Sequence, residues 1–205
     1  MGLDLDDADG QTALNEDEKE GLLIPTIATR GELDEFEQQN IEQALQWSLG
    51  RSFKSETVFT ETFIRLLHEK MFADVWAWAG AFRKTNKNIG VDKWDIPTAL
   101  RNLIDDVKFW HANKIYPPDE LCIRFKHRLV SIHCFPNGNG RHSRLLADIV
   151  IEKIFQLPVY TWGAADVVKE DKPAGGPADQ RTAYLQAIKA ADNGDIQPLI
   201  AFARS

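Results

Sequence analysis

A twelve-residue segment that begins at His133 and ends at Arg144, His-Cys-Phe-Pro-Asn-Gly-Asn-Gly-Arg-His-Ser-Arg, has the residue types and spacing for phosphate chemistry. His133 is a candidate general base, because an imidazole titrates near neutral pH. Gly138 and Gly140 permit positive φ, so that successive backbone N–H groups can face one side. Arg141 and Arg144 lie three residues apart and therefore share one face of a helix. The segment predicts a cradle for a phosphate chain with a base at its edge.

A plainer interpretation is a glycine-rich turn with an incidental histidine and two solvated arginines. Each residue alone is weak evidence, because Gly-x-Gly pairs also occur in ordinary turns. The combination favours the cradle, because the histidine, the turn glycines and the two arginines would all serve the binding and reaction of a phosphate chain. Cys134, beside the histidine, is expected to be a small buried thiol rather than a nucleophile. Phe135 is expected to be buried and to anchor the loop.

Two amphipathic patterns must position this segment. Pro117 to Glu120 is a helix start, with Asp119 as a candidate cap. The motif is therefore expected on a loop between two core helices, and the dipole of the second helix points at the cradle. The apolar positions at helical spacing are Leu121, Phe125, Leu129 and Ile132 before the loop, and Leu145, Leu146, Ile149, Val150 and Ile154 after it.

The rest of the chain also predicts helices. Thr29 and Glu32 form a capping-box pattern at the start of a helix that runs to about Leu49. Residues 83–96 break the helical rhythm and predict a small β-hairpin that turns near Gly90. The fold class is therefore predicted as all-α with one hairpin. Further helices are expected from Ser55 or Thr57 through Met71, from Pro97 through Trp110, from Asp179 to Ala191, and after the cap Asp195, and a surface loop is expected over 169–177.

The formal net charge of −7 arises at the N-terminus, where residues 1–20 hold eight acidic residues and one lysine. This stretch is expected to be a flexible acidic arm, and residues 21–205 a single domain. No basic stripe is present, which argues against a primary role in gripping nucleic acid. The absence of a membrane-span pattern, of a signal pattern and of a disulfide framework predicts a cytoplasmic protein.

The segment from His133 to Arg144 resembles the signature of the Fic/Doc family, His-x-Phe-x-(Asp/Glu)-Gly-Asn-Gly-Arg-x-x-Arg. The resemblance extends to Gly-Ala-Phe-Arg-Lys-Thr at 80–85 and to 181–202. The whole chain resembles the subgroup called mobile mystery protein B. The resemblance implies a Fic-type helical domain, in which the hairpin at 83–96 is a flap that holds a target segment as an added strand.

The resemblance also implies an activity, the transfer of AMP from ATP to a Ser, Thr or Tyr hydroxyl of a target protein. His133 would be the base, and Arg141 and Arg144 would bind the β- and γ-phosphates. The resemblance further implies that Gly138, Asn139 and Gly140 hold phosphate oxygens through their backbone N–H groups and the Asn139 amide. The flap residues implied to dock the target are Asn88, Ile89, Gly90 and Val91.

The sequence departs from the family pattern at two points. Asn137 stands where most members carry the Asp or Glu that holds Mg²⁺, and an amide oxygen is a poorer ligand for a hard cation. Mg²⁺ is still expected, with Asn137 as a weak ligand and nucleotide-binding residue. The self-inhibitory signature is absent in strict form. One hypothesis is that Glu20 pairs with Arg144 and blocks the γ-phosphate, and the alternative is a solvated acidic arm.

Three functions remain open from the sequence. The leading one is a protein adenylyltransferase. The second is a kinase of the Doc type, which would use the same cradle with ATP reversed, or another transferase of a phosphate-containing group. A weakly active nucleotide-binding module in a toxin–antitoxin pair is the third, for which the subgroup implies a helix-turn-helix partner from a neighbouring gene. A zinc site is not predicted, because His68, His111 and His127 lack ligand spacing, and His142 is not expected to be catalytic.

Overall fold

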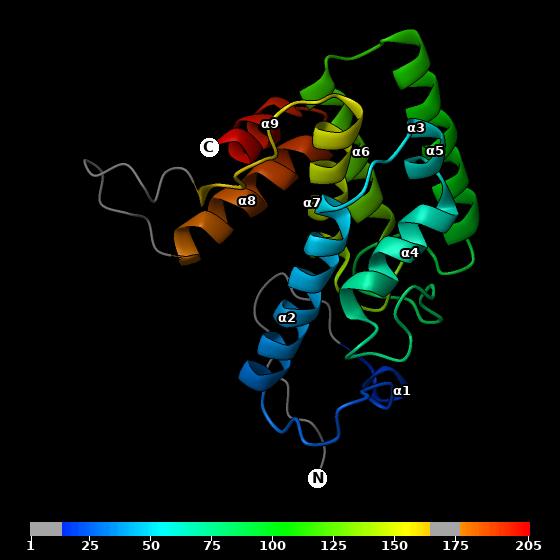
Figure 1. Ribbon diagram of the computed structural model, residues 1–205, viewed down its shortest axis with the longest axis vertical. Helices are drawn as coiled ribbons and strands as arrows, with labels where there is room; N and C mark the ends of the chain where they lie inside the picture. Colours follow the sequence, from blue (N-terminus) through cyan, green and yellow to red (C-terminus); the bar gives the residue numbers. More distant parts are fainter. Residues whose placement is uncertain (1–13, 165–176) are drawn as a thin grey trace.

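The computed structural model describes residues 14–164 and 177–205, and these residues are predominantly helical (Figure 1). This confirms the all-α prediction. None of the helices in these ranges combines the length and apolar character needed to cross a bilayer. In chain order the elements are α1 (Glu16–Lys19), α2 (Arg30–Leu49), α3 (Ser55–Val58), α4 (Glu61–Phe72), α5 (Ile96–Asn113), α6 (Pro118–Ile132), α7 (Asn139–Ile149), the π-helical turn η1 (Val150–Ile154), α8 (Pro177–Asp192) and α9 (Gln197–Arg204).

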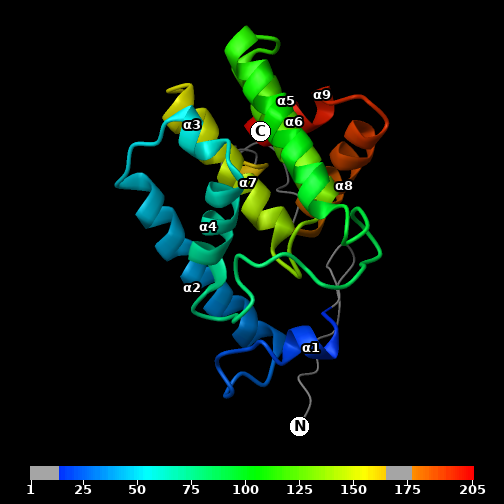
Figure 2. The same ribbon diagram turned by 90° about the vertical axis from the view of Figure 1, so that its right-hand side faces the viewer.

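The helices pack in a continuous series with α6 and α7 at its centre (Figure 1 and Figure 2). α2 packs on α4, α4 on α7, and α7 on α6, while α6 also contacts α5 and α9, and α8 covers α9. The motif loop therefore joins two core helices, as the apolar pattern predicts. The side chains that fill this centre are almost fully buried: Leu121, Phe125, Leu129, Leu146, Ile149 and Val150.

Local capping explains where α2 and α4 begin. Thr29 Oγ1 accepts a hydrogen bond from the Glu32 N–H at 3.3 Å, and the Glu32 carboxylate accepts one from the Thr29 N–H at 3.0 Å. This is the predicted capping box. The helix predicted through Met71 is instead split, because Phe59 leaves helical geometry with ψ near 56°. Thr60 then caps α4 by accepting from the Phe63 N–H at 3.1 Å.

The predicted β-hairpin is not formed as paired strands. Residues 83–95 are an ordered loop of turns and bends, with the predicted turn at Gly90, whose φ is +98°. The backbone carbonyls of Thr85 and Val91 bond to Arg83, and the N–H groups of Arg83 and Val91 bond to the motif segment. The two sides of the loop are joined through the Asn86 side chain, which accepts from the Lys93 N–H, and not by paired backbone groups. Within the described ranges, the β pairing is one isolated antiparallel bridge between Leu22 and Trp76.

The described part of the predicted flexible acidic arm is ordered. Residues 1–13 lie outside the described residues. Residues 14–20 are packed on the domain, because α1 is closed by a capping box between Asn15 and Glu18 and the Glu18 side chain is 8% exposed. The buried Glu18 carboxylate bonds to Thr85 and Lys87 and so holds this segment in place. A count of charges does not show such contacts.

Two predicted caps differ in outcome. Asp195 Oδ1 accepts from the Gln197 N–H at 3.1 Å at the start of α9. Asp119 does not cap α6, whose cap position is Pro117 without a side-chain bond. The Asp119 carboxylate instead binds the Arg204 guanidinium at 2.5 Å and accepts from the Tyr160 hydroxyl at 3.1 Å, so it ties α6 to the C-terminus. The predicted surface loop over 169–177 lies largely outside the described residues.

Candidate active site

His133 ends α6 in the left-handed region, with φ of +58°, and its side chain is 3% exposed. Burial, followed by the charge of Arg83, lowers the pKa of His133 to about 4. The imidazole is therefore neutral at physiological pH and able to accept a proton. Because only 3% of the His133 side chain is exposed, other residues must cover the candidate base.

The cover is the loop over 83–91, which Arg83 fastens to the motif. Arg83 Nε donates to the His133 carbonyl at 2.6 Å and Nη1 donates to the Thr85 carbonyl at 2.8 Å, while Nη2 donates to the Val91 carbonyl. The Arg83 N–H also donates to the Cys134 carbonyl at 2.9 Å. Arg83 is 3% exposed, and its burial lowers its pKa below the ordinary guanidinium value. The Arg83 side chain thus fastens the loop backbone, at Thr85 and Val91, to the backbone of His133.

The approach of the loop to the base is close. The Val91 N–H donates to the Ile132 carbonyl at 3.3 Å. A Cβ added at Gly90 would lie 2.6 Å from His133 Cβ, so this position requires glycine both for its φ and for space. The predicted docking residues Asn88 and Ile89 are exposed on the outer side, whereas the backbone groups of Val91 are used inward.

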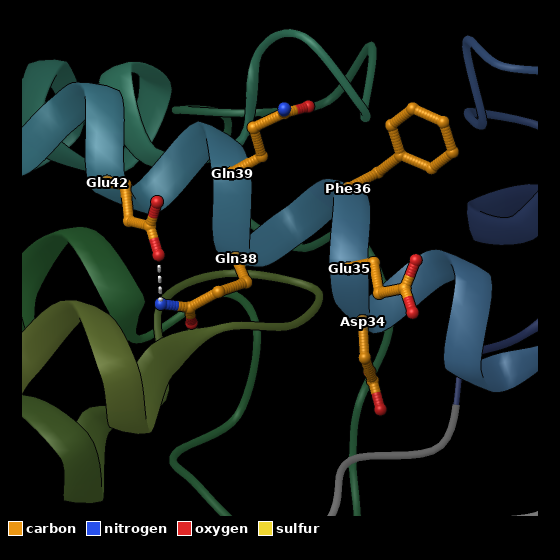
Figure 3. Close-up of a pocket in the computed structure, with 6 residues that line it drawn as sticks. All are labelled: Asp34, Glu35, Phe36, Gln38, Gln39 and Glu42. Carbon is orange, nitrogen blue, oxygen red and sulfur yellow. Dashed lines mark hydrogen bonds between the residues drawn. The ribbon is translucent and has the colours of Figure 1, made fainter.

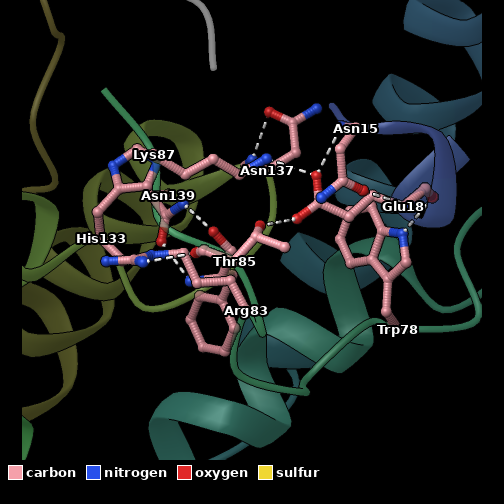
Figure 4. A network of polar contacts seen from close by, with 11 residues as sticks. Asn15, Glu18, Trp78, Arg83, Thr85, Lys87, His133, Asn137 and Asn139 are labelled. Atoms are coloured by element: carbon pink, nitrogen blue, oxygen red, sulfur yellow. Dashed lines mark hydrogen bonds and ion pairs between the residues drawn. The ribbon is translucent and has the colours of Figure 1, made fainter. Parts of the chain in front are cut away.

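The N-terminal helix holds the same loop from its other side (Figure 4). Thr85 Oγ1 donates to Glu18 Oε1 at 3.0 Å, and Lys87 forms an ion pair with Glu18 Oε2 whose side chains are 6% and 9% exposed. The Trp78 indole donates to the Glu18 carbonyl at 2.9 Å. We call this set, Glu18 with Thr85, Lys87 and Trp78, the α1 latch. The sequence gives no signal for Glu18, because its partners in the latch lie sixty or more residues away.

The glycine turn that is predicted to bind phosphate lies at the start of α7. Gly138 has φ of +76°, and the helix begins at the next residue, so its first N–H groups lack intrahelical acceptors. The Gly138 N–H itself is bonded to Asn137 Oδ1 at 2.7 Å. Gly140 does not have positive φ, because it already belongs to the first turn of α7, where no other atoms within 4 Å crowd its missing side chain.

Asn139 has a structural task rather than the predicted phosphate contact through its side-chain amide. Its Oδ1 accepts from the Phe135 N–H at 2.9 Å, and its Nδ2 donates to the Phe135 carbonyl at 2.8 Å. The side chain is 4% exposed, so both ends of the amide are used inside the loop. Phe135 is fully buried, which confirms that it anchors the loop, and Cys134 is 1% exposed with a thiol pKa raised to about 12 by burial.

The two arginines extend from α7 over different aromatic rings. The Arg141 guanidinium lies 5.1 Å from the Phe72 ring centroid, and the Arg144 guanidinium lies 5.6 Å from the Tyr184 ring centroid. Both side chains are partly exposed. A cation held against a ring keeps its N–H donors for an anion, which applies to Arg144 more than to Arg141, because Arg141 also pairs with a carboxylate.

A glutamate does face the cradle, but it is Glu37 rather than Glu20. Glu37 on α2 is fully buried; its Oε1 accepts from the Trp76 indole at 2.6 Å, and its Oε2 lies 2.6 Å from Arg141 Nη1. The second contact is an ion pair without hydrogen-bond geometry. Glu20 is exposed at the end of α1, and no ion pair within residues 14–164 joins it to Arg144.

The donor set does not fit a magnesium ion held by the protein. Asn137 Oδ1 is already engaged by the Gly138 N–H, and in the described part of the chain no three His, Cys, Asp or Glu side chains cluster in a metal-binding arrangement. Mg²⁺ prefers carboxylate oxygens and keeps several waters. No step is therefore assigned to a metal held at Asn137.

A hollow of about 730 Å³ lies elsewhere, along the outer face of α2 (Figure 3). Its lining residues all come from that one helix: Asp34, Glu35, Phe36, Gln38, Gln39 and Glu42. None belongs to the motif, so the hollow plays no part in the site.

A model of the Fic/DOC family matches residues 58–151, a range that contains the covering loop, the histidine, the turn and both arginines. The matching segment, just under half of the chain, is similar to the Fic/DOC family. Over 127 residues it is 29% identical to the protein adenylyltransferase Fic of Drosophila grimshawi, an alignment that covers 60% of this chain and 23% of that relative. The chain thus spans about a quarter of the length of the curated Fic relatives it matches.

Solved Fic structures confirm the fold. A fragment of Fic-1 from C. elegans superimposes with a TM-score of 0.63 at 20% identity, covering 90% of this chain and 50% of that one. BepC from Bartonella tribocorum, solved with bound AMPPNP, gives a TM-score of 0.64 at 18% identity and covers 93% of this chain and 97% of that one. The helical series around the motif loop is therefore the Fic/DOC architecture.

Proposed function

We propose that this chain transfers AMP from ATP to a Ser, Thr or Tyr hydroxyl of another protein. The observation that carries the proposal is the arrangement of three features between the end of α6 and the start of α7. A neutral imidazole ends α6, a left-handed turn precedes α7, and two arginines lie on α7 itself. The names of the adenylyltransferase relatives, and the AMPPNP bound in BepC, support a nucleoside triphosphate as the ligand.

The proposed reaction places the triphosphate at the start of α7. The N–H groups of the first turn and the guanidinium groups of Arg141 and Arg144 would bind phosphate oxygens. The hydroxyl oxygen would attack the α-phosphorus while the bond to the bridging oxygen breaks and pyrophosphate leaves. His133 would accept the hydroxyl proton. The work of the protein is therefore positioning and charge stabilisation.

The cover over His133 implies a resting state. A target hydroxyl reaches the imidazole after the loop over 83–91 moves away, while Asn88 and Ile89 are already exposed for contact with the target. When the loop moves, hydration of the imidazole raises its pKa from about 4 toward the ordinary value of 6.5, which makes it a stronger base at neutral pH. Target docking would thus both expose and activate the histidine.

A second candidate is a nucleotide-binding module with little transfer activity, paired with a small helix-turn-helix protein. Two observations favour it: Asn137 offers no carboxylate, and Arg141 is held by Glu37. In that case ATP binds and no product depends on His133.

The test is incubation of the chain with lysate and ATP labelled at the α- or γ-phosphate, beside a His133→Ala variant. Label from the α-position that enters protein and is lost in His133→Ala supports adenylylation. Label from the γ-position alone identifies a kinase of the Doc type. Binding of ATP without His133-dependent label identifies the binding module.

A further inference from the structure

His68 is a fully buried histidine on α4 that neither the motif nor the proposed reaction uses. Its ring connects two segments that are distant in sequence. The Gly80 N–H donates to His68 Nδ1 at 3.0 Å, and His68 Nε2 lies 3.1 Å from the Asn137 carbonyl oxygen. The ring thus lies between the start of the covering region and the motif loop.

These two partners determine which nitrogen carries the proton. A backbone N–H can only donate, so Nδ1 must be the acceptor and carry no hydrogen. A carbonyl oxygen can only accept, so the hydrogen must be on Nε2. Burial lowers the pKa of His68 well below its ordinary value, and the neighbouring His142 and Arg141 lower it as well, against the opposing effect of the Asn137 bond. The ring is therefore neutral and in one tautomer.

The His68 ring also packs directly on the motif loop. It stacks on Phe135 with ring centroids 3.8 Å apart and an interplanar angle of 20°, and it contacts Phe72 at 4.8 Å. A Cβ added at Gly138 would in turn meet the Phe72 ring. His68 therefore contacts the loop by stacking at Phe135 and by a hydrogen bond at Asn137, immediately before the turn.

The geometry of the peptide unit turns this bond into an orienting device. The Asn137 carbonyl and the Gly138 N–H belong to one planar trans peptide, in which C=O and N–H point in opposite directions. A carbonyl held toward the buried His68 aims the Gly138 N–H the other way, where it now meets Asn137 Oδ1 at 2.7 Å. An anion that displaces this side-chain oxygen would meet a donor already in place.

We propose that His68 is a positioning residue that orients the Gly138 amide for phosphate binding by holding the Asn137 carbonyl through Nε2–H. The role of the amide rests on the proposed function, whereas its orientation can be measured without any ligand.

Two variants separate the two bonds of the ring. His68→Gln places an amide nitrogen near Nε2 and keeps a donor for Asn137. His68→Asn places an amide oxygen near Nδ1 and keeps the acceptor for Gly80. Both lose the stack on Phe135 and one buried hydrogen bond, so their losses of thermal stability should be similar, and their difference isolates the Asn137 bond.

The measurements are ¹⁵N–¹H spectra and amide exchange of the full chain without ligand, and calorimetric binding of inorganic pyrophosphate. We expect the Nε2–H tautomer in the wild type, a Gly138 amide that shifts and exchanges faster in His68→Asn than in His68→Gln, and pyrophosphate binding about tenfold weaker in His68→Asn than in His68→Gln, equivalent to one buried hydrogen bond.

Three results would overturn the proposal: the Nδ1–H tautomer in the wild type, which needs no variant to detect; a Gly138 amide that is the same in both variants; or equal pyrophosphate affinity in both variants while the wild type binds tightly. If the wild type does not bind pyrophosphate but the Gly138 amide responds to His68→Asn alone, the positioning by His68 is supported and the proposed phosphate site is wrong.

Discussion

Replacement of Gly138 by alanine is expected to destabilise the domain strongly. Gly138 has φ of +76°, and the left-handed conformation costs a residue with a Cβ about 1–2 kcal/mol. The added Cβ would lie 2.5 Å from Phe72 Cζ, and the Phe72 ring is 1% exposed and cannot retreat into solvent. Overpacking of this kind costs about 1–3 kcal/mol, so the total is about 2–5 kcal/mol.

For a chain of this size, each kcal/mol shifts the melting temperature by about 2–4 °C, so calorimetry should record a fall of about 4–20 °C in Gly138→Ala. Gly140→Ala is the matched control, because its position has neither positive φ nor an atom within 4 Å outside its own helix. Alanine favours a helix over glycine by up to about 1 kcal/mol, so the control should melt at the same temperature or higher. It should nevertheless weaken pyrophosphate binding, because its methyl group lies in the first turn of α7. Equal losses of stability in the two variants would refute this account of the turn.

Three further predictions follow from the contacts around the site. In Glu18→Gln the α1 latch loses its ion pair, so His133 should react with diethyl pyrocarbonate faster than in the wild type, and an unchanged rate would show that the latch does not hold the cover. In Glu37→Gln, Arg141 loses its ion pair and is free to bind an anion, so calorimetry should show tighter pyrophosphate binding. Weaker binding would mean that Glu37 positions Arg141 instead of competing with the anion. The free energy of unfolding in urea should fall as the pH drops from about 6.5 to 4. His133 and His142 each have a pKa of about 4 in the folded state, and burial lowers the pKa of His68 as well, so these histidines take up protons mainly in the unfolded chain. Asp148, whose pKa is raised to about 6, opposes this over part of the range, and a flat profile would contradict the burial of the three histidines.

The helical framework was predictable because its signals are local. The capping box of Thr29 and Glu32, and the apolar stripe before the motif, involve residues within one or two turns of each other. The break at Phe59 also had a local signal, since Thr60 is a favourable cap that the prediction did not use. The predicted hairpin is absent because backbone groups of Arg83, Thr85 and Val91 bond to a buried arginine side chain and to the motif segment, and no local pattern predicts such partners.

The site was predictable in its backbone and less so in its side chains. The left-handed turn at Gly138 and the position of the arginine pair follow from the motif itself. The internal use of the Asn139 amide could not be read from the sequence, because an amide can bond equally well to a ligand or to its own loop. Glu37 was missed for another reason, since its partner Arg141 is more than a hundred residues away and only the packing of α2 brings them together.

The attachment of the cover through Arg83 has a consequence for how this protein can diversify. Among the described residues, the hydrogen bonds of its guanidinium go to main-chain oxygen atoms, those of His133, Thr85 and Val91. Side chains at exposed positions such as Asn88 and Ile89 can therefore be exchanged while the anchorage persists. Substitutions at these exposed positions can therefore accumulate in related proteins while the loop stays fastened over His133.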